Sequence, residues 1–72
     1  MSTPSVYRVV ELIGSSSDSW EEAARNAVRE ASKAFDDLRV AEVTEMDVLI
    51  EQGNIIAFRT KLRLSYKSNT AE

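Results

Sequence analysis

Apolar and polar residues alternate with a period of two along much of this chain, which is the pattern of β-strands. The clearest case is the segment FRTKLRLSY at positions 58–66. Its apolar-side positions are Phe58, Thr60, Leu62, Leu64 and Tyr66, and between them stand Arg59, Lys61, Arg63 and Ser65. One face of this predicted strand therefore belongs in a core, and the other carries three cations that need water or partners.

Two further segments carry the strand pattern. Positions 6–13, VYRVVELI, are rich in β-branched residues and apolar on both faces, and Gly14 with the serines at 15–17 is predicted to end this strand. Positions 38–52, LRVAEVTEMDVLIEQ, predict a long second strand, and positions 55–66 predict the third. Between the last two, Gln52, Gly53 and Asn54 are typical of a hairpin loop in which Gly53 takes a positive φ.

The segment 17–37 has the three- and four-residue spacing of an amphipathic helix. Its apolar stripe consists of Trp20, Ala24, Ala27, Val28, Ala31 and Phe35. Ser17 or Asp18 is the predicted N-cap, and Asp18 with Glu21 has the spacing of a capping box. Since half of the stripe is alanine, we expect the helix to lie close against a sheet.

These elements predict an α+β fold of order β-α-β-β, in which one helix packs on one face of a three-stranded antiparallel sheet. The chain, 1–72, is expected to be a single domain with flexible tails at 1–5 and 68–72. One helix covers only one face of such a sheet, so the other face would expose Val9, Ile13, Val43 and Leu49 or their counterparts on the opposite face. Exposed apolar patches of this kind mark interfaces, which predicts assembly with other subunits.

Composition strengthens the prediction of an assembly. The 72 residues include no cysteine and no histidine, so disulfides and the usual zinc ligands are excluded, and a domain this small needs another support. The net charge of −3 argues against a nucleic-acid partner, and the apolar runs are too short for a membrane span. The first residues lack the pattern of a signal peptide, so the cytoplasm is the expected location.

The candidate chemistry is narrow. Without His or Cys, and without a Gly-x-Ser-x-Gly turn or a glycine-rich phosphate loop, the sequence predicts that the protein is not an enzyme. Only oxygen-ligated cations such as Ca²⁺ or Mg²⁺ suit the side chains present. The acidic candidates, which are alternatively solvated acids or ion-pair partners, are Asp36, Asp37, Glu42, Glu45 and Asp47. Symmetric copies of one acid in an oligomer are a further source of ligands.

The three cations of segment 58–66 have candidate partners on the second strand. If the hairpin loop centres on Gly53, Asp47 lies near Arg59 and Glu45 lies near Lys61. We therefore expect an acid of the same or a neighbouring chain to hold Arg59, which would not stand free as an anion site. A surplus of carboxylate oxygens beside these pairs would suit a hard cation.

The chain resembles the dodecin family over nearly its whole length. The segments that carry the resemblance are VYRVVELIGSSSDSWEEAARNAV near the start, RVAEV at the beginning of the second strand and FRTKLRLSY in the third. The resemblance implies a hollow homododecamer, so the expected partners are copies of the same chain. In many dodecins it also implies a non-catalytic role in storing or sequestering riboflavin and related flavins.

Two positions depart from the flavin-binding pattern of that family. Val40 stands where flavin-binding dodecins have a tryptophan that stacks on the isoalloxazine ring. Arg59 stands where they have a glutamine that hydrogen-bonds the polar edge of the flavin. Valine offers no aromatic face and arginine only donates hydrogen bonds, so tight flavin binding is not expected.

The same departures are similar to those of a dodecin subgroup described as calcium-binding, which implies Ca²⁺ as the candidate ligand. Glu45 and Asp47 are the oxygen ligands that we select for it. The resulting hypothesis is a non-enzymatic homododecamer that binds or sequesters small ligands or ions, with no certain cofactor. The alternatives are a store for riboflavin or FMN, as in typical dodecins, and a purely structural assembly.

Overall fold

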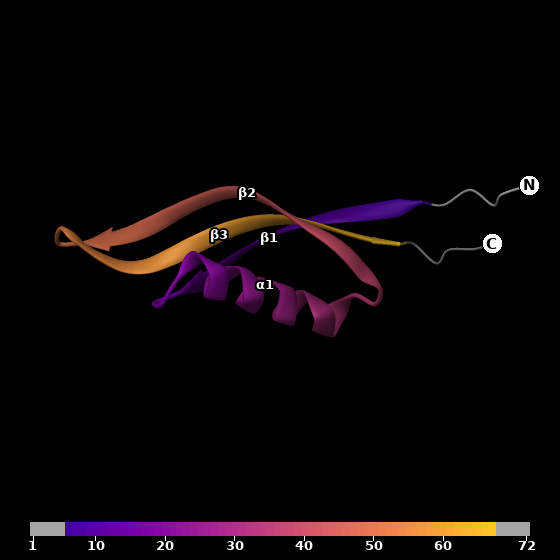
Figure 1. Ribbon diagram of the computed structural model, residues 1–72, viewed down its shortest axis with the longest axis horizontal. Helices are drawn as coiled ribbons and strands as arrows, with labels where there is room; N and C mark the ends of the chain where they lie inside the picture. Colours follow the sequence, from indigo (N-terminus) through magenta and orange to yellow (C-terminus); the bar gives the residue numbers. More distant parts are fainter. Residues whose placement is uncertain (1–5, 68–72) are drawn as a thin grey trace, which may run out of the picture.

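The computed structural model describes residues 6–67, which form one helix and three strands (Figure 1). In chain order the elements are β1 (Tyr7–Ser16), α1 (Trp20–Ala34), β2 (Leu38–Glu51) and β3 (Asn54–Lys67). Neighbouring strands are antiparallel and their spatial order is β1-β3-β2, so β3 is central. This confirms the predicted α+β fold and its β-α-β-β order. The predicted tails at 1–5 and 68–72 lie outside the described residues.

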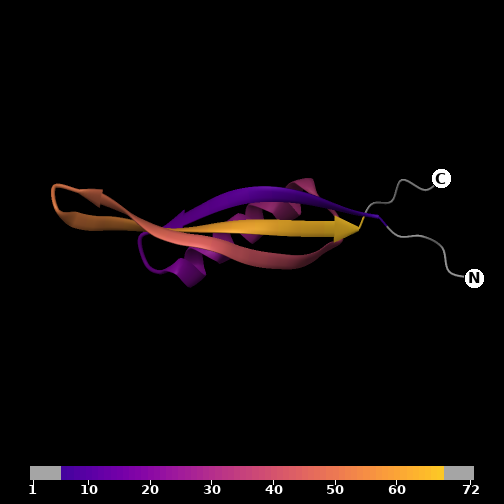
Figure 2. The ribbon, with the colours of Figure 1, turned by 90° about the horizontal axis from the view of Figure 1, so that it is seen from above.

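Helix α1 lies against one face of the sheet, mainly over β1 and β3 (Figure 2). The fully buried apolar residues between them are Ala23, Ala27 and Ala31 of α1 with Leu62 and Leu64 of β3. Short alanine side chains let the helix approach the sheet closely, so the core is thin. Among the described residues, no helix is long and apolar enough to cross a membrane.

Gly14 brings β1 and α1 into direct contact. A Cβ atom at this position would overlap the backbone carbonyl of Ala23, so no larger residue fits without displacing the helix. Gly14 pairs with Thr60 inside the sheet, and β1 continues to Ser16. The prediction that Gly14 and the following serines end the strand was therefore wrong, because the glycine is required by the helix above it. Ala23 is fully buried at this contact, although the predicted stripe omitted it.

The N-cap of α1 lies at Ser19, so the prediction of Ser17 or Asp18 was wrong. Ser19 Oγ accepts a hydrogen bond from the backbone N–H of Glu22 at 3.0 Å. The capping-box spacing thus falls on Ser19 and Glu22, one residue later than the predicted Asp18 and Glu21. The bond satisfies one of the backbone donors that the first turn of a helix leaves free.

Strand β2 does not keep a single alternation along its length. Val43 lies opposite Leu62 whereas Glu45 lies opposite Lys61, so the register with β3 shifts by one residue between them. Thr44 is the extra residue, and its hydroxyl donates to the carbonyl oxygen of Lys61 at 3.2 Å. Because directly opposite residues share a face, this bulge leaves Val43 on the helix side and Glu45 on the other side. The prediction that Val43 lies on the uncovered face was therefore wrong.

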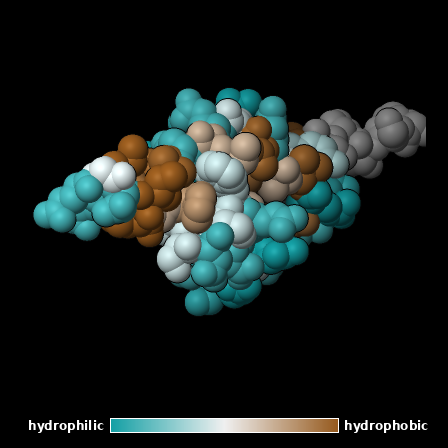
Figure 3. Space-filling model, turned by 60° about the vertical axis from the view of Figure 1, so that its left-hand side comes forward, coloured by the Kyte–Doolittle hydropathy of each residue, from teal (hydrophilic) through white to brown (hydrophobic). Residues whose placement is uncertain are grey.

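The β2–β3 hairpin projects beyond the rest of the molecule (Figure 1). Strand β1 ends opposite Phe58 of β3. Among residues 6–67, no third strand therefore lies beside residues 49–57, which we call the arm. A two-residue turn closes the arm, with Gln52 and Gly53 both at positive φ, 51° and 81°. Figure 3 shows hydrophobic surface gathered behind the polar tip of the molecule's projecting end.

Candidate functional site

The face of the sheet that α1 leaves uncovered, which we call the open face, combines charged and apolar side chains. The cross-strand register places on it Val9, Glu11 and Ile13 of β1; Val40, Glu42, Glu45, Asp47 and Leu49 of β2; and Arg59, Lys61 and Arg63 of β3. Val9, Ile13 and Leu49 are exposed, as predicted. Acids and cations therefore lie in neighbouring rows among exposed apolar residues.

Arg59 and Asp47 form the best-defined ion pair of the open face. Arg59 Nε and Nη2 donate to the two carboxylate oxygens of Asp47 at 2.8 and 2.7 Å. These hydrogen bonds lower the pKa of Asp47 and raise the pKa of Arg59 from their ordinary values. The structure confirms the expectation that an acid of the same chain holds Arg59.

Lys61 has a partner from β1, and Arg63 has partners from both β1 and β2. Glu11 of β1 lies 4.0 Å from Lys61 and 3.7 Å from Arg63, and Glu42 of β2 lies 3.6 Å from Arg63. These separations are longer than that of a close ion pair, so water screens the attraction. Glu11 was not among the predicted partners, although its alternation with the apolar residues of the first strand is the signal that would have indicated it.

Glu45 is left without a cation within 4.0 Å among residues 6–67. Its register partner is Lys61, as predicted, but the contact of the Lys61 ammonium is with Glu11. The predicted ion pair between Glu45 and Lys61 is therefore not formed. Glu45 and Asp47 share a strand and a face, and of the two only Asp47 is neutralised.

The remaining acidic candidates also differ in whether a cation pairs with them. Asp37 accepts hydrogen bonds from Arg39 at 2.7 and 3.3 Å, which lower the pKa of Asp37. Within residues 6–67, no three acidic side chains gather closely enough to hold a metal ion. Among the candidates on the open face, Glu45 is the carboxylate that no cation of the described chain occupies.

Val40 and Arg59, the two altered flavin-site positions, share the open face but lie far apart along it. Val40 lies opposite Ser65 whereas Asp47 lies opposite Arg59, a separation of about 20 Å along the strand at its usual rise per residue. Val40 is 61% exposed. One chain therefore does not bring these two positions together.

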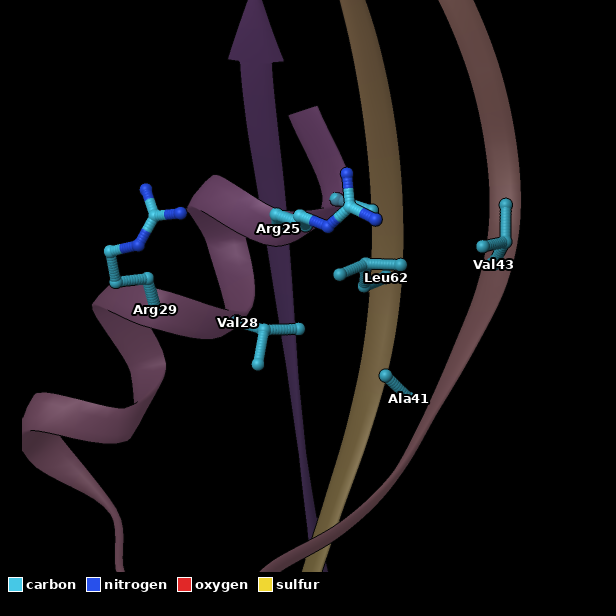
Figure 4. A pocket seen from close by; sticks show the side chains of 7 residues that line it. Arg25, Val28, Arg29, Ala41, Val43 and Leu62 are labelled. Atoms are coloured by element: carbon cyan, nitrogen blue, oxygen red, sulfur yellow. The ribbon is translucent and has the colours of Figure 1, made fainter. Parts of the chain in front are cut away.

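A second unfilled surface lies on the helix side of the sheet, where α1 leaves β2 largely uncovered (Figure 4). This groove has a volume of about 410 Å³. Its lining residues are Ala24, Arg25, Val28 and Arg29 of α1, Ala41 and Val43 of β2, and Leu62 of β3. The sequence analysis did not predict the groove, because the bulge at Thr44 is what leaves Val43 on this side.

Comparisons with known protein sequences identify relatives of similar length. The family profile that matches the chain is that of dodecin, over residues 6–69. The chain is also similar to the calcium dodecin of Mycobacterium tuberculosis, with 44% identity over 68 residues, which is 94% of this chain and 96% of that protein.

Solved structures have the same architecture. The dodecin of Streptomyces coelicolor matches with a TM-score of 0.90 at 33% identity, covering 97% of this chain and 100% of that one. The calcium dodecin of Mycobacterium tuberculosis, described as a calcium-chelating immunodominant antigen with a novel calcium-binding site, matches with a TM-score of 0.81 at 43% identity. That match covers 93% of this chain and 96% of the other.

Proposed function

This chain belongs to the dodecin family, and on that premise we propose that it forms a hollow homododecamer that binds small ligands or ions and catalyses no reaction. The support comes from the surfaces that a single chain leaves uncovered, since large apolar residues are exposed on both faces of the sheet and on the arm. A small domain with a thin core gains stability when copies cover such surfaces. Its proposed partners are its own copies, with no nucleic acid or membrane, and its proposed location is the cytoplasm.

Ca²⁺ is the proposed ligand, with Glu45 as its principal protein ligand and Asp47 as the second. The single observation that carries this proposal is the Glu45 carboxylate, which has no ion-pair partner within residues 6–67, on a face where the neighbouring acids have cations. Similarity to a calcium dodecin supports it. Ca²⁺ takes about six to eight oxygen ligands, so several copies of the chain would contribute. Asp47 keeps unused lone pairs after accepting from Arg59.

Flavin binding in the manner of typical dodecins is disfavoured by the same face. Val40 provides no ring for stacking, an interaction that contributes roughly 0.5–1.5 kcal/mol beyond burial for an aromatic pair. Arg59 has no acceptor atom, and two hydrogen bonds hold it to Asp47. Flavin storage and a purely structural assembly are the alternative functions that an experiment must separate.

Isothermal titration of the chelator-stripped protein distinguishes these functions. We expect saturable Ca²⁺ binding and no riboflavin binding at submicromolar concentration. Glu45→Gln is expected to weaken Ca²⁺ binding by about tenfold or more, because Ca²⁺ affinity follows the charge of the ligands. Asp47→Asn is expected to weaken it less, because Arg59 already shares the Asp47 carboxylate.

Glu30→Gln is the matched control. It removes the same charge from an exposed position of α1, where Glu30 lies 3.4 Å from Lys33, and should bind Ca²⁺ like the parent. Light scattering checks that each variant has the mass of the assembly. Unchanged Ca²⁺ affinity in Glu45→Gln contradicts the assigned ligand. Tight riboflavin binding by the parent indicates flavin storage, and binding of neither ligand indicates a structural assembly.

A further inference from the structure

We propose that the arm of one chain docks into the groove of another copy, between its α1 and β2. This inference rests on the proposed homo-oligomer and identifies a contact that builds it. The contact is head-to-tail: each chain gives its arm to one neighbour and receives the arm of another.

The arm is a surface that requires cover. Its large apolar residues, which are between 39% and 66% exposed, are Leu49, Ile50, Ile55 and Ile56. A two-stranded hairpin on its own is marginally stable in water, and the arm is such a hairpin because β1 ends at Ser16. The hydrophobic surface near the projecting end is visible in Figure 3. The arm therefore needs a partner surface that is apolar and concave.

The groove has these properties. Its floor is aliphatic, formed by the side chains of Val28, Val43 and Leu62 with two alanines, and it has room for several aliphatic side chains. The arm of the same chain does not reach it, because Val43 in the groove and Ile50 in the arm lie about 20 Å apart on one strand. The arm that fills the groove must therefore come from a second copy.

The charges of the two surfaces are complementary. Arg25 and Arg29 extend from α1 beside the groove (Figure 4). The arm carries one charged residue, Glu51, which directly precedes the turn. Neither Arg29 nor Glu51 has an ion-pair partner among residues 6–67, while Arg25 lies 3.5 Å from Glu22. Docking would bring Glu51 to the cationic rim as the isoleucines enter the groove.

A second copy fits these observations better than a small ligand or an unrelated peptide. The arm and the groove occur once each on every chain, so one repeated contact covers both. A fatty-acyl anion in the groove would meet the arginines and the aliphatic floor, but would leave the arm exposed. A head-to-tail contact is heterologous, and it closes into a ring when the rotation between neighbours permits.

Cysteine pairs test this contact cleanly, because the natural chain has no cysteine. The variant that carries both Val28→Cys and Ile55→Cys is treated with a short bismaleimide reagent and separated under denaturing conditions. We expect a ladder of covalent oligomers that ends at the size of the ring. The control combines Glu30→Cys, on the exposed side of α1, with Ile55→Cys, and should give no ladder.

The outcomes separate the contact from the assembly. If light scattering gives the dodecamer mass and the Val28–Ile55 pair yields no cross-link, the docking proposal is wrong and the assembly stands. Dimers as the sole covalent product would also overturn it, because an isologous contact links chains only in pairs. A co-purifying fatty-acyl anion without cross-links assigns the groove to an amphiphile. A monomer overturns both the assembly and the docking.

A charge exchange keeps the test decisive if the cysteine variants fail to fold. Glu51→Arg places a cation against Arg29, and Arg29→Glu places an acid against Glu51, so each single change should lower the fraction of assembled protein. The combination should restore it. If the loss of assembly in the double variant equals the sum of the losses in the two single variants, the two residues are not in contact and the proposal fails.

Discussion

Glu45 and Asp47 stand on one strand and face the same side of the sheet, yet their surroundings differ. Asp47 lies opposite an arginine, whose planar guanidinium offers two N–H groups in the geometry of a carboxylate. Glu45 lies opposite Lys61, whose compact ammonium sits on a flexible stem and contacts Glu11 instead. The type of cation across the strand therefore explains why Asp47 is paired within the chain while Glu45 has no cation among residues 6–67.

The Asp47–Arg59 pair predicts a specific pH dependence. Arg59 lowers the pKa of Asp47 in the folded chain, so the pair stabilises the fold above the ordinary pKa of an aspartate, about 3.9, and this stability is lost as the pH falls through the lowered pKa. Asp47→Asn should therefore have a lower melting temperature than the parent at pH 7. The difference should be only a few degrees, because water screens this half-exposed pair. The difference should shrink below about pH 4.

Thermal melts of the parent and Asp47→Asn at a series of pH values measure this difference. Asp36→Asn is the control, because Asp36 has no ion pair among the described residues. The melting temperature of this variant should equal that of the parent at every pH. A gap between parent and Asp47→Asn that stays constant down to pH 2 would show that the ion pair does not contribute the stability.

At the scale of elements, the β2–β3 hairpin shows why the pairing of its two strands was predictable, whereas the face of the sheet that each β2 residue occupies was not. The prediction set Asp47 opposite Arg59 by centring a three-residue loop on Gly53. The structure reaches the same pairing with a two-residue turn and one unpaired residue, Ile56. Thr44 then shifts the register again, and the hydrogen bond that accompanies this bulge reaches the backbone of β3. The period-two pattern describes each strand separately, so it does not predict such contacts between residues far apart in the sequence.

The candidate site was predictable to the same extent. The pairing of Arg59 with Asp47 follows from strand periodicity and the turn, which are local signals. The contact of Glu11 with Lys61 and Arg63 requires β1 to lie beside β3. The local sequence does not predict this order of the strands. The groove likewise depends on how α1 crosses the sheet.

The structure at the start of α1 predicts that replacing Ser19 and replacing Ser17 have different effects on stability. Ser19 Oγ accepts a hydrogen bond from the N–H of Glu22, so Ser19→Ala should reduce stability by about 1 kcal/mol. Ser17 precedes the cap, and Ser17→Ala should change stability little. Urea denaturation at equal protein concentration measures both. Equal losses in the two variants would contradict the cap at Ser19.

The whole molecule leaves much apolar surface exposed, and the proposed assembly would cover it. The fully buried core consists of three alanines and two leucines, whereas Val9, Ile13, Val40 and Ile50 are each more than half exposed. Any pocket that uses both Val40 and Arg59 must lie between chains, because one chain keeps these positions about 20 Å apart. In the proposed assembly, ligand choice would therefore depend on the contacts between chains, and a change of ligand has to be measured on intact oligomers.

The combination of Val40→Trp with Arg59→Gln should convert the proposed assembly into a flavin binder. The tryptophan supplies the stacking face, and the glutamine amide supplies both a donor and an acceptor in place of the guanidinium that Asp47 holds. Titration should show quenched riboflavin fluorescence for the double variant, weaker quenching for each single change and none for the parent. Because the pocket lies between chains, dissociating the oligomer should abolish the quenching.

The matched control for that conversion is Val9→Trp with Arg59→Gln, which places a tryptophan at another exposed position of the open face. It should quench riboflavin fluorescence less than the Val40 variant does, because its ring stands across β3 from position 40 and not at the position that stacks on the flavin in the family. If Val40→Trp with Arg59→Gln has the mass of the parent assembly and still fails to quench, then these two positions do not form a flavin pocket in this protein. Weak flavin binding by the parent, if titration finds it, would then have another cause than the valine and the arginine.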